Sequence, residues 1–136
     1  ILHFDAHTDL YDDLDNNKYS HACPFARIME EGLVENAAKI GAYALERMQH
    51  MKSKYDLIGD VRGRGFLLGI DLVEDRVSKK GANDAAEEIL YRAFDAGLSF
   101  KTTMGNVLTL TPPLITTRKQ MDFALDVLED AIGDVS

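Results

Sequence analysis

The chain has 136 residues, of which 46% are hydrophobic and 28% are charged, and its formal net charge at pH 7 is −8. This length suits a single domain, residues 1–136, with a real hydrophobic core. The acidic balance, without a cluster of basic residues, argues against a surface for nucleic acid or an anionic membrane. No apolar run is long enough to span a membrane, so we expect neither of these partners.

The cysteine content and the first residues indicate the compartment. Cys23 is the only cysteine, so no internal disulfide can form, which suits a reducing cytoplasm. No charged stretch followed by a short apolar segment marks a secretory signal. We therefore expect a cytoplasmic protein, and the start at Ile1 rather than at Met suggests a fragment.

The first 32 residues predict a strand, a loop and a helix. Ile1–Phe4 has the pattern of a short buried strand, and the acidic, Asn-rich stretch Tyr11–Lys18 predicts a solvated loop. We expect a helix over Ala22–Glu31, with Ser20 as its N-cap and Gly32 closing its C-terminal end.

A longer helix is predicted next, over Val34–Lys52. The apolar residues that recur at helical spacing in it are Ala37, Ile40, Ala44, Met48 and Met51. The charged residues of this segment lie mostly off that stripe, so we expect one face to pack against the core.

The stretch after this helix predicts a β-hairpin, around which the rest of the chain is organised. Between Phe66 and Val73, apolar residues alternate with the period of a half-buried strand. Gly63–Gly65 predicts a tight reversal that joins this strand to a shorter one at Asp60–Gly63. Gly69, in the middle of the long strand, predicts a bulge or a close backbone approach.

The last third of the chain predicts two helices with two strands between them. We expect a helix over Asp84–Ala96, capped by Asn83, and a final helix from Arg118 to about Ile132 that opens with a capping box. The capping-box residues are Thr117 and Gln120, and the intervening strands are Leu98–Thr102 and Val107–Thr111, joined by the turn Met104–Asn106.

From Val34 onward the predicted order is therefore α-β-β-α-β-β-α. An α+β fold satisfies this order, with two layers: a mostly antiparallel four-stranded sheet and helices on one face. The N-terminal strand, loop and helix precede it.

Four stretches match one known family in order and spacing: Leu33–Ala37, Leu57–Gly65, Leu68–Asp71 and Gly105–Pro113. With them, residues from about 33 to 136 resemble the small C-terminal domain of class III aminotransferases that depend on pyridoxal phosphate. The resemblance implies that a separate large domain, not matched by this chain, holds the groups that bind the cofactor. These groups are the Schiff-base lysine, the aspartate at the ring nitrogen and the phosphate-binding loops. We therefore expect no bound pyridoxal phosphate and no transamination here.

The same resemblance bears on three basic or polar positions. Several family members carry Arg where this chain has Thr109, so the substrate-carboxylate contact implied by the family is in doubt. Lys101 alternates outward on its strand, toward solvent. Arg62 and Arg64 flank the hairpin turn, and we weigh an anion site there against a solvated rim.

Residues 1 to about 32 resemble a different family. His3–Asp9, extended by Ser20–Phe25 and Glu30–Gly32, is similar to the metal-site segment of the arginase and agmatinase ureohydrolases. Glu30–Leu33 would suit either family. Two resemblances that meet there suggest a chimera, engineered or natural.

The ureohydrolase resemblance implies a manganese site. It would make Asp5, His7 and Asp9 ligands of Mn²⁺, and His21 a proton-shuttling residue, the one candidate catalytic group. Ligands at alternate positions of an extended chain project to one side, and carboxylate with imidazole suits this ion. The family's other ligands have no counterpart, so a two-metal centre cannot form, and solvated turn residues are the alternative reading.

Three functions follow from these observations. The first is a structural fusion without a complete catalytic site. The second is a weak Mn-binding module through Asp5, His7 and Asp9. The third is an association domain that forms a homodimer through apolar sheet residues, for which the candidates are Leu67, Val73, Met104 and Val107.

Overall fold

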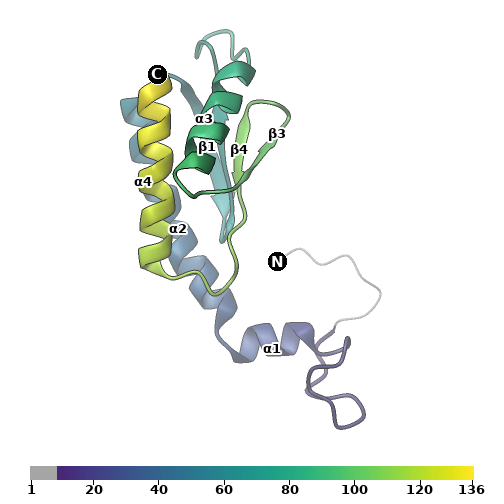
Figure 1. The fold of residues 1–136 in the computed structure, drawn as a ribbon. Coiled ribbons are helices and arrows are strands. Elements are labelled where there is room, and N and C mark those ends of the chain that lie inside the picture. Colours follow the sequence, from purple (N-terminus) through teal and green to yellow (C-terminus); the bar gives the residue numbers. More distant parts are fainter. Residues whose placement is uncertain (1–8) are drawn as a thin grey trace. The chain divides into compact units, whose positions relative to one another are not determined.

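The structure, a computed structural model, describes residues 9–136. The chain forms two compact units, residues 1–35 and 36–136, and each is described by itself. Figure 1 labels their helices and strands. The strand expected at Ile1–Phe4 lies outside the described residues and stays a prediction.

The first unit contains a loop and the short helix α1 (Pro24–Glu30). Pro24 occupies its first position, where its missing N–H costs nothing. Ser20 is not the N-cap, because Cys23 takes that place without a side-chain bond, and the Ser20 hydroxyl accepts instead from the Ala22 N–H at 3.5 Å. Gly32 follows the helix with a φ of +67°, as the sequence predicts for a helix end.

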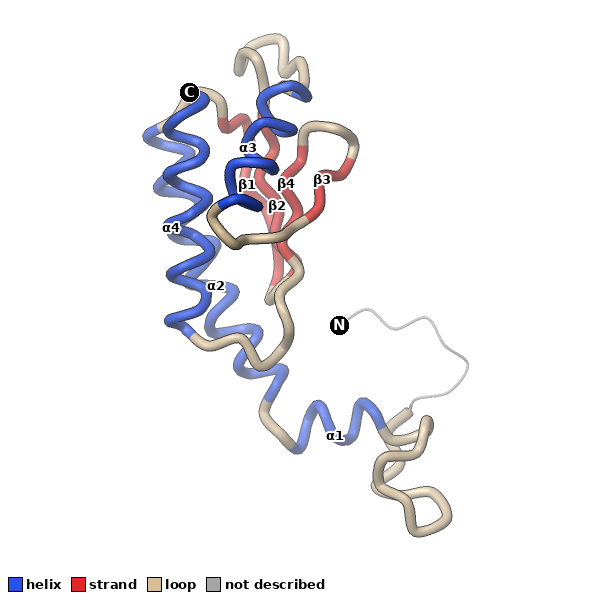
Figure 2. The backbone as a smooth tube through the Cα atoms, viewed as in Figure 1, coloured by secondary structure: helices blue, strands red, loops and turns tan. Residues whose placement is uncertain are grey.

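The second unit is an α+β fold, as predicted. Its helices are α2 (Leu33–Lys54, which begins just before the unit), α3 (Asn83–Asp95) and α4 (Arg118–Val135). Its strands are β1 (Ile58–Arg64), β2 (Leu67–Leu72), β3 (Lys101–Thr103) and β4 (Val107–Leu110). In the described residues these four strands form one sheet in the order β1-β2-β4-β3, with every neighbouring pair antiparallel (Figure 2).

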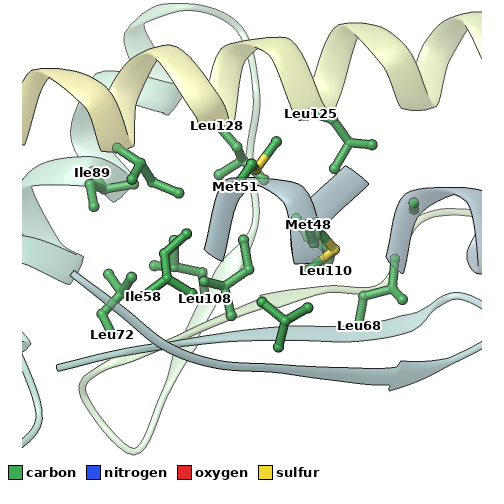
Figure 3. Packing of buried hydrophobic residues seen from close by; sticks show 14 of the residues in the cluster. Met48, Met51, Ile58, Leu68, Leu72, Ile89, Leu108, Leu110, Leu125 and Leu128 are labelled. Carbon is green, nitrogen blue, oxygen red and sulfur yellow. The ribbon is translucent and has the colours of Figure 1, made fainter. Parts of the chain in front are cut away.

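The core lies between one face of this sheet and the helices (Figure 3). The predicted apolar stripe of α2 is buried throughout, and so are the alternating residues of the long strand. Side chains of α4 and α3 complete the layer, among them Leu125, Leu128 and Ile89, each fully buried. Among the described residues, no helix is long and apolar enough to cross a membrane.

The hairpin turns at Gly65 and Phe66, because Arg64 pairs with Leu67. Gly65 has a φ of +57°, a conformation that favours glycine. The predicted bulge is not at Gly69, which pairs regularly with Arg62; the register shifts instead between Ile58 and Asp60. The shift is at Gly59, whose ideal Cβ would stand 2.6 Å from the Val73 side chain, so the close approach occurs there.

Two helix starts differ in how they are capped. Asn83 is the first residue of α3 rather than its cap, and Ala82 precedes it without a side-chain bond. The Asn83 side chain lies instead against the turn at Gly105. At α4 the predicted capping box is present, with Thr117 and Gln120 bonding to each other's backbone N–H.

Candidate functional site

The sheet face opposite the helices carries polar side chains in register. Arg62, Gly69 and Thr109 form one row across β1, β2 and β4. We call this surface the open sheet face. Successive side chains of a strand point to opposite faces of the sheet. The apolar side chains next to this row along each strand therefore point toward the helices and are buried.

Charges on the open sheet face are paired with each other. The Arg62 guanidinium donates to Asp60 at 3.3 Å and to Asp71 at 3.2 Å, Lys52 donates to Asp60 at 3.1 Å, and the Asn106 amide donates to Asp71 at 2.7 Å. The bond from Lys52 lowers the pKa of Asp60, and the bond to Asp71 raises the pKa of Arg62. Arg62 is thus committed to two carboxylates, which weakens the case for an anion site.

A shallow groove of about 540 Å³ crosses this face. Gly69 forms part of its floor, and Leu67, with 63% of its surface exposed, stands on its rim. The Thr103 and Thr109 hydroxyls bond to each other at 2.8 Å along one side. Arg64 lines the groove too and forms no ion pair with a described residue. The groove is therefore an exposed apolar strip with polar borders.

Two of the four predicted association residues are not available on this surface. Val73 and Val107 are only 4% and 6% exposed. Val73 fills the space above Gly59, and Val107 packs beside Gly69, because neither glycine has a side chain. Leu67 and Met104 are exposed as expected, at 63% and 89%.

The groove does not by itself fit pyridoxal phosphate. That cofactor needs a lysine for its imine and an acidic partner for its ring nitrogen. The groove has no lysine among its described lining residues, and both carboxylates of the face, Asp60 and Asp71, are already bound to Arg62. The groove therefore supplies none of the groups that bind this cofactor.

The predicted manganese ligands are only partly described. Asp9 has a φ of +51°, while Asp5 and His7 lie outside the described residues. Within residues 9–136, no three His, Cys, Asp or Glu side chains are grouped so that they could hold a metal ion. The manganese site therefore stays a prediction.

His21, the candidate proton carrier, is an exposed residue of a turn. It forms no hydrogen bond or ion pair with another described residue, so nothing in that part of the chain orients its ring. A proton-transfer role for His21 is likewise untested.

Two arginines that the sequence analysis did not single out make specific contacts. Arg27 of α1 has 14% of its side chain exposed, pairs with Glu30 at 2.7 Å and donates to the Asp12 carbonyl at 3.0 Å. Arg76 donates to the carbonyls of Lys52 and Tyr55 at 2.6 and 2.8 Å, at the end of α2. Only the Arg27–Glu30 spacing of three on a helix could have been noticed in the sequence.

Comparison with known families gives a match over most of the chain. The family model for class-III aminotransferases matches residues 22–132. Among curated proteins, a leucine/methionine racemase of Thermococcus litoralis is 46% identical over 108 residues, which is 79% of this chain and 24% of that protein. A mitochondrial alanine–glyoxylate aminotransferase homologue of Arabidopsis thaliana is 38% identical over 75% of this chain and 22% of its own length.

Solved structures agree with this match. A Bacillus anthracis aminotransferase superposes with a TM-score of 0.74 and 32% identity, over 84% of this chain and 28% of that chain. An amine transaminase from an uncultivated Pseudomonas species, in its PLP-bound form, gives a TM-score of 0.76 and 33% identity, over 85% and 27%. The chain thus spans about a quarter of the length of the relatives it matches.

The match also moves the boundary that the sequence suggested. We expected the aminotransferase-like part to begin near residue 33, whereas the family model already covers Ala22 and all of α1. None of the matches named above is to a ureohydrolase. By the family match and by the solved structures alike, the chain belongs to the class-III aminotransferases.

Proposed function

We propose that residues 36–136 act as the small domain of a class-III aminotransferase-type enzyme, packing with the open sheet face against a larger part that holds pyridoxal phosphate. The chain alone then catalyses no transamination. The observation that carries this proposal is a sheet covered by helices on one face, with an exposed apolar groove on the other. An apolar surface of this kind is typical of an interface.

The names of the relatives point to different substrates of one chemical class. One is a racemase of leucine and methionine and another an alanine–glyoxylate aminotransferase homologue, so we infer an amino acid or a related amine. Thr109 is neutral and bonded to Thr103. We infer that the substrate carboxylate is bound elsewhere in the enzyme.

A domain graft tests the packing role. The segment of the Thermococcus litoralis racemase that matches this chain is replaced by residues 33–136, and the absorbance of bound pyridoxal phosphate is recorded. We expect the cofactor band to be retained, and to be lost when Gly69→Asp places a charge in the groove. Asp95→Asn, at the exposed end of α3, is the control. A graft that binds cofactor equally well with Gly69→Asp contradicts the proposal.

An activity assay tests the second half of the proposal. The full 136-residue chain is incubated with 4-aminobutyrate, a keto acid and pyridoxal phosphate. Product that depends on the protein would show that a complete reaction centre exists here.

Self-association through the same face is a second candidate function, favoured by the exposure of Leu67. Without the larger domain, two copies could cover each other's groove. We expect light scattering to show a concentration-dependent dimer that Leu67→Lys weakens. Tyr91→Lys, at an equally exposed apolar position of α3 (61%), is the matched control. A monomer at every concentration excludes this function.

The fusion hypothesis was made for residues 1 to about 32, and the family match leaves it only the residues before Ala22. We propose that they are a ureohydrolase-derived segment without a complete metal centre, in which Asp5, His7 and Asp9 bind Mn²⁺ weakly. Millimolar Mn²⁺ should then raise the melting temperature, because a ligand that prefers the folded state stabilises it. An equal rise in His7→Ala excludes the metal site, and urea release that Asp5→Ala abolishes would overturn the absence of catalysis.

A further inference from the structure

Lys101 completes a row of residues across the open sheet face. It pairs with Thr109 on β4, Thr109 pairs with Gly69 on β2, and Gly69 pairs with Arg62 on β1. A cation therefore stands at each end of this row, three strands apart, which is about 14 Å at the usual spacing of strands. Lys101 is exposed, and its ammonium group forms no ion pair with a described residue.

The rows on either side of this one differ in charge. In one of them Asp60 pairs with Asp71, and both carboxylates accept from Arg62, at 3.3 and 3.2 Å. In the other, nearer the hairpin turn, the exposed Arg64 pairs with Leu67. The acids of the face are thus already neutralised, whereas Arg64 carries, like the lysine of the middle row, a charge that no described carboxylate balances.

The open sheet face is the basic part of an acidic chain, whose formal net charge is −8. A second hollow, of about 380 Å³, adjoins the groove and shares Arg62 with it. Basic residues outnumber acidic ones in the lining of the two hollows: they are Lys52, Arg62, Arg64, Arg76 and Lys79, against Asp60 and Asp71. The basic residues come from α2, from β1 and from the loop after β2, so no run of them marks this cluster in the sequence.

A neutral or basic surface would cover this face at a high cost. Arg64 lines the groove, and Lys101 lies beside Thr109, which lines it too. A surface that fills the groove therefore also removes water from these two cations. A cation that loses its water without gaining a carboxylate loses hydration free energy that nothing replaces. Opposite charges across an interface restore it and exclude partners of the wrong charge.

On the basis of the packing role given above, we propose that the surface covering the open sheet face is acidic, with one carboxylate against Arg64 and another against Lys101. Its bearer is the larger part of the enzyme, the part that holds pyridoxal phosphate. A second copy of this chain fits less well, because its own open sheet face brings the same unbalanced cations, and like charges across an interface repel.

The first experiment locates the charge on the full 136-residue chain. Hexaglutamate, a probe that offers only carboxylates as side chains, is titrated at low salt and followed by nuclear magnetic resonance of the backbone amides. We expect saturable shifts in residues 62–69 and 101–109, which disappear in about 0.5 M salt because the charges are screened. Arg64→Gln and Lys101→Gln should each weaken binding about threefold, the effect of losing one exposed ion pair.

Lys119→Gln is the matched control, because Lys119 is exposed in the first turn of α4, in the helix layer, and forms no ion pair with a described residue. It should leave the affinity for hexaglutamate unchanged. Three results overturn the proposal: no saturable shifts, shifts centred outside the open sheet face, or equal losses of affinity in all three variants.

The second experiment adds the larger part, in the racemase graft described above. Arg64→Glu and Lys101→Glu reverse the two charges. We expect each to raise the dissociation constant of pyridoxal phosphate about tenfold, since each brings like charges together. Lys119→Glu should leave this constant unchanged. In the full 136-residue chain each reversal should shift the melting temperature by less than about 2 °C, because an exposed residue without a partner contributes little to stability.

The charge reversals distinguish this proposal from the packing role. If Gly69→Asp abolishes cofactor binding in the graft while both reversals leave it intact, the packing role stands and the acidic partner surface is wrong. If binding survives Gly69→Asp as well, both are wrong. A full chain that dimerises through this face, and so hides it from hexaglutamate, makes a second copy the occupant and overturns the proposal.

Discussion

Gly41 is in the interior of α2, where a glycine normally lowers helix stability by about 1 kcal/mol relative to alanine. In this structure the backbone of another segment lies too close to Gly41 for a side chain. An ideal Cβ at Gly41 would stand 2.1 Å from the carbonyl oxygen of Gly65 and 2.5 Å from its carbonyl carbon. Helix α2 therefore touches the hairpin turn backbone to backbone, and Gly41 and Gly65 are coupled across that contact.

Gly41→Ala should thus be destabilising, against helix propensity. Because the colliding atoms are backbone, relief requires the helix or the turn to move, and we expect a loss of about 1–3 kcal/mol in the free energy of unfolding. Gly133→Ala, in α4, is the control. There the atom nearest to an ideal Cβ is the Tyr55 hydroxyl at 3.1 Å, which is the far end of a side chain and can move. The higher helix propensity of alanine should therefore prevail and raise the free energy of unfolding by up to about 1 kcal/mol. Urea unfolding followed by circular dichroism measures both, and changes of the same sign would contradict this account.

Arg76 holds the C-terminal end of α2 from a loop more than twenty residues away. Besides its bonds to Lys52 and Tyr55, it donates to the Ile58 carbonyl at 3.2 Å. Last-turn carbonyls of a helix have no partner within the helix. The guanidinium thus supplies a donor to the Lys52 carbonyl, whereas the Tyr55 carbonyl also accepts from the Ile58 N–H at 3.2 Å.

Replacing this residue should loosen the end of α2. We expect Arg76→Ala to cost about 1.5–3 kcal/mol, the usual range for hydrogen bonds to a charged group, and Arg76→Lys to recover only part of it, because an ammonium lacks the planar fork. Hydrogen exchange of the amides in the last turn of α2 reports the effect locally. Protection that is unchanged in Arg76→Ala would exclude the capping role.

At the scale of elements, periodicity predicted what depends on local pattern. The alternation that begins at Phe66 predicted the long strand and its buried face, although the strand itself begins at Leu67. The spacing of Thr117 and Gln120 predicted the start of α4. The caps expected at Ser20 and Asn83 were wrong. Helix α1 begins at Pro24, with Cys23 as its N-cap. Helix α3 begins at Asn83 itself, so Ala82 is the N-cap. A polar residue near a helix start does not determine which backbone N–H it meets.

Features set by contacts between distant elements could not be predicted. The bulge is at Gly59 because Val73 crosses above it, and Arg76 reaches α2 because the loop after β2 returns there. No local pattern encodes either approach.

Helices α2 and α4 are joined by charges. Arg47 donates to Asp126 at 3.0 Å and to Glu129 at 3.3 Å, and Lys54 donates to Glu129 at 2.9 Å. The bond from Lys54, aided by Arg47, lowers the pKa of Glu129 below its ordinary value of 4.5. Glu129 is partly shielded from solvent, with 22% of its side chain exposed. Its ion pairs therefore contribute more to stability than the fully exposed pairs around them.

This shift predicts a pH dependence of stability. A carboxyl group with a lowered folded-state pKa stabilises the fold fully above its unfolded-state pKa, and that contribution is lost as the pH falls through the folded-state value. We expect the free energy of unfolding to fall on acidification below about pH 4.5, less steeply in Glu129→Gln than in the parent chain. Glu87→Gln, on an exposed part of α3, should leave the slope unchanged. Parallel pH profiles for both variants would contradict the assignment.

For the molecule as a whole, family resemblance predicted more than composition did. Residues 33–136 were placed in the right family from a few motifs, but the boundary lay near Ala22 rather than Gly32. The exposure of Leu67 and Met104 was predicted, whereas Val73 and Val107 proved buried. Their burial depends on neighbouring glycines, which a strand's own alternation does not reveal.

The hydrophobic core suggests that the second unit folds without the first. Among the described residues, the core cluster begins at Ala37 and ends at Ile132, and Cys23, the buried residue of the first unit, is not part of it. Removing residues 1–32 keeps the whole of α2 and every core side chain. We therefore expect the shortened chain to unfold cooperatively in urea, with a free energy of unfolding within about 1 kcal/mol of the full chain.

Removal of residues 118–136 is the matching control, since it deletes α4 and exposes the core that Leu125 and Leu128 cover. Burying each such side chain contributes about 1.5–3 kcal/mol. The free energy lost with the buried side chains of α4 therefore exceeds the total free energy of unfolding of a typical domain. That variant should show no cooperative transition. If removing residues 1–32 abolishes the transition as well, the first unit is needed for the fold, and the second cannot serve as an independent small domain.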